Sequence, residues 1–468
     1  MAFRLLIDGK LVEGASRLDV INPASGTVFE TCACADEVQL KQAIAAAKRA
    51  FPGWASLTQA ARGDCLDRLA DAVQARLDEM SSLLTGEQGK PLNQSKGEIA
   101  MAVATLRYFA TQDLPLQTIK DTEEGRVLEQ RTPLGVVAAI TPWNYPVYLL
   151  AVKVALGLVV GNTMVAKPAP STPLTTSLFG EVAADILPPG VFNVIIDAND
   201  LGSKLTTHPD VAKISFTGST STGKRVMESA ADTLKRVTLE LGGNDAAIIL
   251  DDVDVAEVAR KVFTAATVNA GQICLATKRI YAPRSLYDAL CDELATLAQK
   301  AVVDDGLKQG TQIGPVQNKQ QYEKVLDIIE EAKTLGTVIA GGHALDRPGY
   351  FIAPTVVRDL PDSARLVREE QFGPAIPVLA YDSVDEVIER VNDSEYGLGG
   401  TIWTAATDRG LEIAMRIQSG TIWVNKPVEL PFDIPLGGAK QSGIGRELGI
   451  DGMKEFTQGK IINVARHS

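Results

Sequence analysis

The sequence predicts an α/β protein in which parallel β-sheets are covered by helices on both faces. Strand-like apolar runs alternate with amphipathic helical segments along most of the 468 residues, most regularly between Val136 and Leu250. Alternation of this kind is typical of parallel sheets with crossover helices. The length also exceeds what one hydrophobic core usually supports, so we expect two or three domains.

The first half of the pattern is expected to form one sheet with its covering helices. Buried strands are predicted at 135–140, 163–167, 191–196, 213–216 and 237–240, and helices at 146–160, 173–186 and 222–231. After Gly242 and Gly243 the pattern repeats, with strands at 246–250 and 279–282 and helices at 255–269 and 286–302. We place the boundary between two α/β domains at these two glycines.

Two segments fit neither half. Residues 116–134 are polar, charged and strand-like, and residues 460–464 form a short apolar strand near the end of the chain. Exposed strands pair with another subunit more readily than they stand alone. We therefore expect both segments to serve assembly.

Composition narrows the classes of partner. Hydrophobic residues make up 45% of the chain and charged residues 22%, the balance of an ordinary globular protein. The net charge of −12 disfavours nucleic acid and anionic membrane surfaces. The most apolar stretch, 147–160, is too short to span a bilayer, and the first residues lack the pattern of a signal peptide. Five scattered cysteines favour a reducing cytoplasm over a disulfide framework.

The strongest chemical signal is a cysteine with a glutamate upstream. Cys274 follows a glycine and a glutamine that break the preceding helix, so we expect its thiol on a loop. Glu240 ends a buried strand, at the edge where open α/β sheets place their sites. A thiolate attacks carbonyl carbon well, and a carboxylate can take a proton from the thiol or from water. The pair predicts covalent chemistry on an aldehyde or acyl group, whereas the alternative is a packed cysteine and a carboxylate that caps a turn.

A third position supports that chemistry. Asn144 lies in a turn that Pro142 and Pro146 make rigid, directly after a predicted strand. Its amide could help the Cys274 backbone N–H hold a developing oxyanion. The commoner use of asparagine in such a loop is an Asx-turn.

Evidence for phosphate binding is weaker. Residues 216–223 follow a strand and open a helix, which presents backbone N–H groups to a phosphate. Their G-x-x-x-x-G spacing matches neither the GxGxxG fingerprint nor a Walker loop. Lys167 ends another strand and could contact ribose or phosphate oxygens, or could be a solvated surface charge.

Metal and serine-hydrolase sites have little support. The three histidines are widely separated and no paired-cysteine spacing is present, so we expect no catalytic metal. A G-x-S-x-G nucleophile elbow is also missing.

Together the motifs resemble those of the aldehyde dehydrogenase family over nearly the whole chain. The matching segments, in family order, are TPWN at 141–144, KPA at 167–169, FTGST at 216–220, LELGG at 239–243, GQIC at 271–274, EQFGP at 370–374 and GGAKQSG at 437–443. The chain resembles most the NAD(P)-dependent, hydrolytic, non-acylating branch, which includes semialdehyde dehydrogenases.

The resemblance implies a three-part architecture. It comprises a Rossmann-like cofactor domain at 1–115 and 135–241, an α/β catalytic domain at 242–441, and a small β oligomerisation element at 116–134 and 442–468. It also implies a cytoplasmic homodimer or homotetramer.

The resemblance further implies a role for each matched residue. Cys274 would attack the aldehyde to give a thiohemiacetal, Asn144 would hold its oxygen, and Glu240 would activate the water that hydrolyses the thioester. NAD or NADP would be bound by Thr141, Pro142, Trp143, Lys167, Ala169, Pro170, Thr217, Gly218, Ser219, Leu241, Gly242, Glu370 and Phe372. The site of the small-molecule aldehyde substrate would be lined by Tyr145, Tyr148, Ile273, Leu275, Leu430 and Phe432.

Two departures from the family pattern concern the cofactor. Pro170 stands where NAD-preferring members often carry a glutamate that grips the adenosine ribose, which leaves NADP or dual use open. Residues 197–200, Asp-Ala-Asn-Asp, replace a loop that is usually rich in glycine.

Two other functions remain as alternatives. A CoA-acylating semialdehyde dehydrogenase would pass the thioester to CoA, but such relatives tend to lack the glutamate that stands here at position 240. A non-catalytic member of the fold would be expected to lose Cys274, Glu240 or Asn144, and all three are present.

Overall fold

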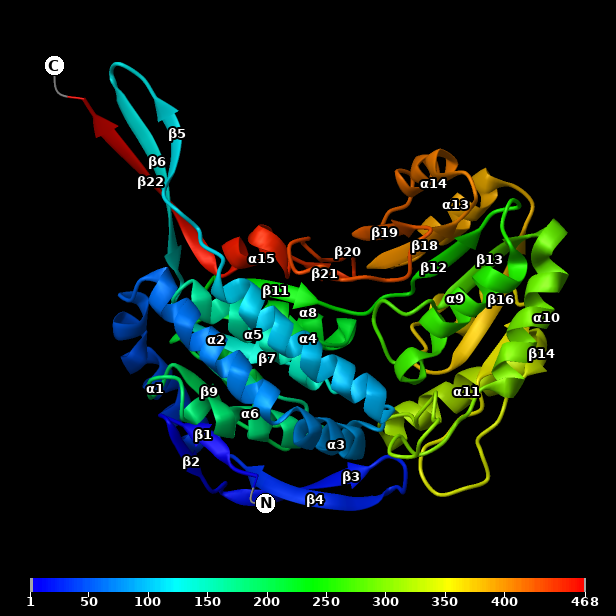
Figure 1. Ribbon diagram of the computed structural model, residues 1–468, viewed down its shortest axis with the longest axis horizontal. Helices are drawn as coiled ribbons and strands as arrows, with labels where there is room; N and C mark the ends of the chain where they lie inside the picture. The colour runs from blue at the N-terminus through cyan, green and yellow to red at the C-terminus, as the bar shows by residue number, and fades with distance from the viewer. Residues whose placement is uncertain (1–2, 467–468) are drawn as a thin grey trace.

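The computed structural model describes residues 3–466, which form two α/β lobes and a projecting β arm (Figure 1). The first lobe is built on an eight-stranded sheet in the order β2-β1-β9-β8-β7-β10-β11-β21. These strands are Lys10–Val12, Leu5–Ile7, Phe192–Val194, Thr163–Lys167, Val136–Ile140, Val211–Thr217, Arg236–Glu240 and Gly443–Ile444. The five strands from β9 to β11 run parallel, and antiparallel strands close both edges.

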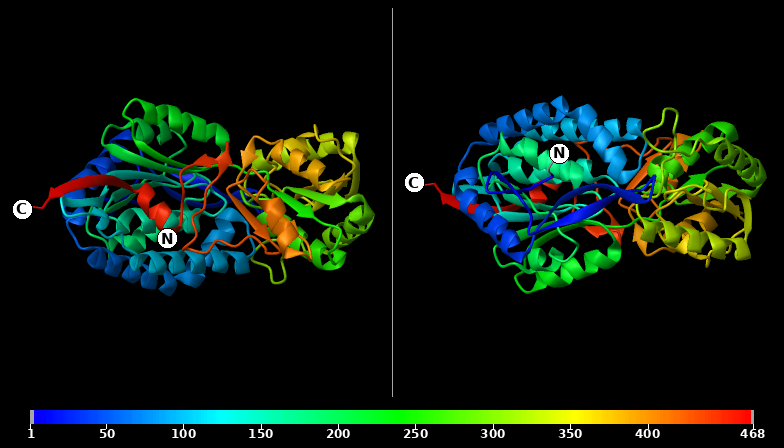
Figure 2. Two further views of the ribbon diagram at one scale, coloured as in Figure 1. Left: turned by 90° about the horizontal axis from the view of Figure 1, so that it is seen from above. Right: turned by 90° about the horizontal axis from the view of Figure 1, so that it is seen from below.

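Helices cover both faces of this sheet (Figure 2). They are α1 Glu37–Ala55, α2 Gln59–Ala75, α3 Leu77–Gln88, α4 Leu92–Ala110, α5 Pro146–Val159, α6 Leu174–Ala184, α7 Gly202–Thr207 and α8 Thr220–Ala231. Helix α5 is buried along nearly its whole length because it contacts β7 and β8 on one side and α2 and α4 on the other. A helix that is apolar all round is expected in such an inner layer. Strands β3 Ser16–Asn22 and β4 Thr27–Cys34 form a separate hairpin.

The second lobe has a seven-stranded sheet in the order β14-β15-β16-β13-β12-β18-β19. Its strands are Thr337–Ala340, Thr355–Arg358, Ala375–Tyr381, Arg279–Pro283, Ala246–Ile249, Gly399–Trp403 and Thr421–Val424, all parallel except β14. Successive residues of β12 point to opposite faces, so that Ile248 joins one apolar cluster and Ile249 another. The surrounding helices and short strands are α9 Val255–Thr267, α10 Arg284–Lys300, α11 Lys319–Leu335, α12 Arg365–Arg368, α13 Val384–Asn392, α14 Thr407–Ala414, β17 Tyr396–Gly397 and β20 Ala439–Lys440.

The arm contains the two segments that fitted neither domain. Strands β5 Gln117–Asp121, β6 Gly125–Pro133 and β22 Thr457–Ala465 form a three-stranded antiparallel sheet that projects from the first lobe (Figure 1). The range 442–468 expected for the oligomerisation element spans more than the arm. Strand β21 pairs with β11 in the first sheet, and α15 Gly449–Glu455 contacts α5.

Most of the predicted strands and helices occur at the expected places, with small differences at their ends. Strand β9 is shorter than the predicted 191–196, and β10 begins two residues before the predicted 213–216. Helix α9 ends at Thr267 rather than at residue 269. Among the helices of residues 3–466, none combines the length and the apolar character that a membrane crossing needs.

Candidate active site

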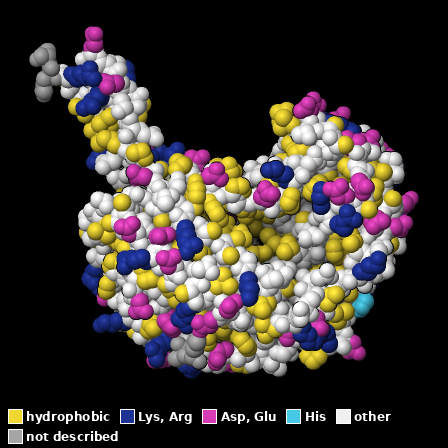
Figure 3. Space-filling model, in the orientation of Figure 1, with side chains coloured by type: hydrophobic (Ala, Val, Ile, Leu, Met, Phe, Trp, Pro, Cys, Tyr) yellow, Lys and Arg dark blue, Asp and Glu magenta, His cyan; other side chains and the backbone are white. Residues whose placement is uncertain are grey.

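Cys274 lines a cavity of about 690 Å³ between the two lobes. Figure 3 shows hydrophobic side chains gathered in the hollow between the lobes. The cavity brings together residues that lie far apart in the sequence, including Asn144, Cys274 and Glu447. Of the six positions expected to line the substrate, it includes Tyr145, Tyr148, Ile273, Leu275 and Leu430. Phe432 is not among the lining residues and instead packs against Tyr108, with ring centroids 5.8 Å apart.

A left-handed turn places Cys274 at the cavity. Directly after α9, Asn269, Ala270 and Gly271 have φ values of +51°, +53° and +74°. A side chain at Gly271 would meet the Gly373 carbonyl oxygen at 2.4 Å, so glycine is required there by both conformation and space. The buried Lys278 ammonium donates to the carbonyl of Ile273, which anchors the peptide just before the thiol.

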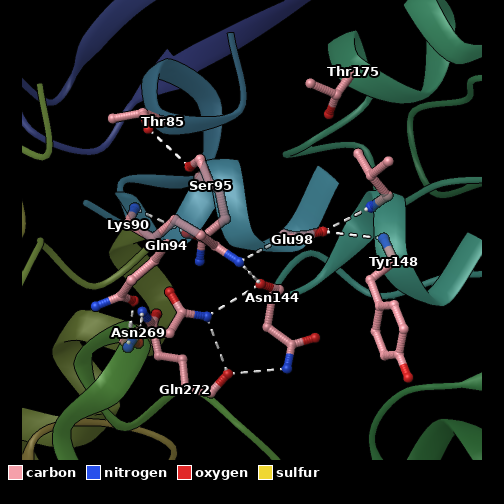
Figure 4. A network of polar contacts seen from close by, with 12 residues as sticks. Thr85, Lys90, Gln94, Ser95, Glu98, Asn144, Tyr148, Thr175, Asn269 and Gln272 are labelled. Carbon is pink, nitrogen blue, oxygen red and sulfur yellow. Dashed lines mark hydrogen bonds and ion pairs between the residues drawn. The ribbon is translucent and has the colours of Figure 1, made fainter. Parts of the chain in front are cut away.

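Asn144 lies against the same loop. Its Nδ2 donates to the Gln272 carbonyl at 2.9 Å, and its own carbonyl accepts from Asn269 Nδ2 at 3.1 Å (Figure 4). The Cys274 backbone N–H has no hydrogen-bond acceptor within residues 3–466. An oxyanion formed at the thiol would therefore have the free Cys274 N–H available, with the Asn144 amide held close by.

A buried ion pair holds Asn144 from behind. Lys90 Nζ lies 2.5 Å from Glu98 Oε2, with both side chains fully buried, and donates to the Asn144 carbonyl at 2.7 Å. The other Glu98 oxygen accepts from the backbone N–H groups of Val147 and Tyr148 at 2.9 and 3.2 Å, at the start of α5 (Figure 4). This pair was not predicted from the sequence, although Glu98 lies on the buried face of α4, where a carboxylate is unusual without a partner.

Glu240 is a buried carboxylate with an unused oxygen. It ends β11, its side chain is 6% exposed, and Oε1 finds no hydrogen-bond partner among the described residues. Burial raises the pKa of Glu240 well above its ordinary value, and the nearby Glu447 charge raises it further. Glu447 itself is paired with Lys153, whose ammonium also donates to Ser215 and Thr217 hydroxyls at 3.1 and 2.8 Å.

The Cys274 thiol is held in its protonated form by its surroundings. Burial raises the pKa of Cys274 to about 12, and the charges of Glu370, Asp245 and Glu240 act in the same direction. The positive charge of Lys278 opposes this shift. A base is therefore needed to make the thiolate at neutral pH.

The residues expected to hold the cofactor lie along the carboxyl edge of the first sheet. Ser219 is exposed and caps α8, where its Oγ accepts from the Thr222 N–H at 3.3 Å. Lys167 ends β8, and the Thr141 N–H donates to its carbonyl at 3.2 Å, so the turn at 141–143 lies beside 167–170. Thr217 and Gly218 follow at the end of β10, where the Gly218 N–H donates to the Glu240 carbonyl at 3.0 Å.

The remaining residues expected to hold the cofactor lie where the carboxyl edge of the first sheet faces the second lobe. Glu370 Oε1 accepts from the Gly243 N–H at 3.0 Å, and a side chain at Gly242 would meet Glu370 Oε2 at 2.4 Å. The Phe372 ring stands edge-on to Trp143, with centroids 5.3 Å apart. Leu241 packs over Gly223, while Pro142, Ala169 and Pro170 are half-buried. A helix N-terminus, a lysine and a carboxylate in one row fit the phosphate and ribose groups of a dinucleotide.

Comparison with known proteins decides the family. The model of the aldehyde dehydrogenase family matches residues 11–462. The chain belongs to this family. A protein of Leishmania tarentolae named mitochondrial aldehyde dehydrogenase is 38% identical over 474 residues, covering 99% of this chain and 95% of that protein. A betaine aldehyde dehydrogenase of Vibrio vulnificus is 37% identical over 453 residues, covering 95% and 93%.

Solved structures agree with the sequence relatives. The NAD⁺ complex of a Bacillus cereus aldehyde dehydrogenase has a TM-score of 0.97, with 36% identity over 99% of this chain and 97% of that chain. The expected α/β architecture of this family is thereby confirmed. The protein is an oxidoreductase that acts on aldehydes. Within residues 3–466, no cluster of three or more His, Cys, Asp or Glu side chains is arranged to hold a metal ion.

We predict that Glu98→Gln destabilises this aldehyde dehydrogenase by about 3–5 kcal/mol, because it leaves the buried Lys90 ammonium without its counter-charge. Denaturant unfolding of the purified protein measures the effect. Asp382→Asn is the control, because it breaks an ion pair with Arg284 whose side chains are 68% and 62% exposed. Equal stability of wild type and Glu98→Gln would contradict the assigned role of the pair.

Proposed function

We propose that the protein oxidises an aldehyde to a carboxylic acid, with NAD or NADP as electron acceptor, through a covalent adduct on Cys274. The observation that carries this proposal is the arrangement of two groups at one cavity with a third acting on them from beside it. The Cys274 thiol and the Asn144 amide, which donates to the Gln272 carbonyl, line the cavity. Glu240 is buried with a free oxygen, and its charge acts on the Cys274 thiol. The NAD⁺ complex of the Bacillus cereus relative supports the choice of cofactor.

The first step forms the bond between sulfur and carbon. The thiol loses its proton to Glu240 or to solvent, and the thiolate attacks the carbonyl carbon of the aldehyde. The carbonyl oxygen becomes an oxyanion beside the Cys274 N–H and Asn144 Nδ2, which stabilise it. A nicotinamide cofactor, held by the residues along the carboxyl edge of the first sheet, would supply the acceptor for the hydride of the tetrahedral carbon. Loss of that hydride leaves a thioester on Cys274.

The second step releases the acid. Glu240 takes a proton from water, the oxygen of that water attacks the thioester carbon, and the bond to sulfur breaks. The Cys274 thiolate leaves and is reprotonated, which restores the starting thiol. Burial raises the pKa of Glu240 above its ordinary value, which makes its carboxylate a stronger base than an exposed one.

The lining of the cavity favours an aldehyde whose carbon chain is largely apolar. Apart from the reacting groups, its inner wall includes Met101, Val152, Leu430 and Leu436. Charged side chains of α9, among them Arg260 and Lys261, also line it and are themselves exposed.

We expect Glu240→Gln to separate the two steps. Steady-state turnover should fall about 10²–10⁴-fold, the usual contribution of a general base, while mixing with aldehyde and NAD⁺ still gives a burst of NADH. Stopped-flow absorbance measures both phases, and Cys274→Ala serves as the control that loses both. Equal loss of burst and turnover in Glu240→Gln would show that thiol activation is its main duty.

The pH dependence of turnover should follow the ionisation of Glu240. Because burial raises the pKa of this carboxyl and only its ionised form is a base, the deacylation rate should increase as pH rises through that pKa. Steady-state kcat measured between pH 5 and 9 should show this increase, and the increase should be absent in Glu240→Gln. A rate that is independent of pH in the wild type would contradict the assignment.

The acylating alternative is tested by adding CoA to the same turnover assay. A rate that requires added CoA would favour that alternative.

We also propose that the arm joins subunits into a homodimer or homotetramer. Every residue of β5 is exposed, and Leu116, Ile119, Ile461 and Val464 leave apolar surface in water on the arm. Such an edge strand is stabilised by pairing with another chain. Analytical ultracentrifugation should show a dimer or tetramer, and Ile461→Lys should shift it toward monomer. A wild-type monomer at micromolar concentration would exclude this role.

A further inference from the structure

We propose that Asp197, through an ion pair with Lys167, makes the adenosine end of the cofactor site selective for NAD over NADP. The inference rests on the proposed function, because it presumes that the carboxyl edge of the first sheet binds the dinucleotide. It concerns two places where the sequence departs from its family, Pro170 and the loop at 197–200. Neither departure alone decides the cofactor.

The two residues meet at the ends of neighbouring strands. Lys167 is the last residue of β8, and Asp197 follows β9, whose pairing with β8 extends to a bond from the Ile195 N–H to the Ala166 carbonyl at 2.9 Å. Lys167 Nζ lies 2.7 Å from Asp197 Oδ1. The carboxyl ends of parallel strands form the edge where open α/β sheets bind nucleotides.

Asp197 is fixed in place and cannot turn away from the lysine. Its side chain is 0% exposed, and its second oxygen accepts from the Leu201 N–H at 2.8 Å, which closes the 197–200 loop. Oδ1 receives no well-directed hydrogen bond, and Lys167 Nζ donates none to any other group in the described part of the chain. The contact is therefore ionic, and the ammonium keeps N–H groups free for ribose hydroxyls.

The pair changes what the lysine attracts. An isolated lysine at this edge would favour a 2′-phosphate, which carries a charge of about −1.5 to −2 at neutral pH. Asp197 cancels the charge of Lys167, and burial strengthens the repulsion between this carboxylate and an added phosphate. Lys204, which lies shortly after the 197–200 loop, is paired with Glu37, and Pro170 supplies no charge.

Asp197 thus supplies from the next strand the negative charge that position 170 lacks. In dinucleotide folds an acidic residue near the ribose favours NAD, whereas an uncompensated basic residue accommodates NADP. A buried carboxylate does not touch the ribose itself, so Asp197 is a positioning residue that acts through Lys167.

Calorimetric titration of the wild-type protein with ADP-ribose and with 2′-phospho-ADP-ribose tests the inference without turnover. We expect ADP-ribose to bind at least tenfold more tightly. In Asp197→Asn, which keeps an acceptor for the Leu201 N–H, the ratio should fall at least tenfold because Lys167 is left uncompensated. The matched control is Asp200→Asn, which removes an exposed carboxylate from the same loop and should leave the ratio unchanged.

Each outcome distinguishes this inference from the function on which it rests. Equal binding of the two nucleotides to the wild type, or tighter binding of the phosphorylated one, overturns the role of Asp197 but leaves the dehydrogenase proposal intact. An unchanged ratio in folded Asp197→Asn also overturns it. Failure of the wild type to bind either nucleotide overturns the cofactor site and the inference with it. If Asp197→Asn does not fold, the wild-type ratio still decides.

Discussion

The buried ion pair of Lys90 and Glu98 is the contact on which the geometry of the site depends. Glu98 accepts from the first N–H groups of α5, and Lys90 donates to the carbonyl of Asn144 directly before that helix. The pair therefore fixes both ends of the turn that presents the Asn144 amide. Because Asn144 in turn bonds to Gln272, the first lobe reaches the cysteine loop of the second lobe through one chain of polar contacts (Figure 4). Compared with an apolar pair of similar volume, a fully buried ion pair adds little net stability, although removing one partner is costly. Geometric precision is therefore the better account of why the pair stands here.

The same site concentrates buried carboxylates whose ionisation is costly. Burial raises the pKa of Glu240 and Glu370, and raises the pKa of Asp245 to about 7. Burial lowers the pKa of Lys278, whereas the neighbouring Glu370, Asp245 and Cys274 oppose this shift. Perturbed groups of this kind cluster at functional sites, because the protein spends stability there to set proton affinities. In the proposed mechanism, the Cys274 thiol reacts only after a base has accepted its proton.

Some elements could be predicted from the sequence with their bounds, and others could not. Strand β8 coincides with the predicted 163–167, because an apolar centre of Met164, Val165 and Ala166 lies between Gly161 and Pro168, two residues that favour the ends of an element. The end of α9 was not predictable, since Ala270 adopts a left-handed conformation that its side chain disfavours. Tertiary contacts hold this turn, and residue preference does not reveal them.

The position of a side chain in the candidate site was equally hard to predict. Phe432 carries an aromatic ring suited to a substrate wall, but the fold directs that ring to Tyr108.

Contacts between distant residues explain what motif comparison leaves open. Position 170 alone suggests a missing acidic group, because a motif records one residue and its neighbours in sequence. The sheet instead places residue 197 beside residue 167, thirty residues earlier, and an electrostatic field depends on position in space and not on which strand supplies the charge. A cofactor preference can therefore be kept while its usual residue is lost, provided that another carboxylate is buried within contact of the same lysine. For that reason the charge balance around Lys167, and not the identity of residue 170, is the quantity that decides which nucleotide binds.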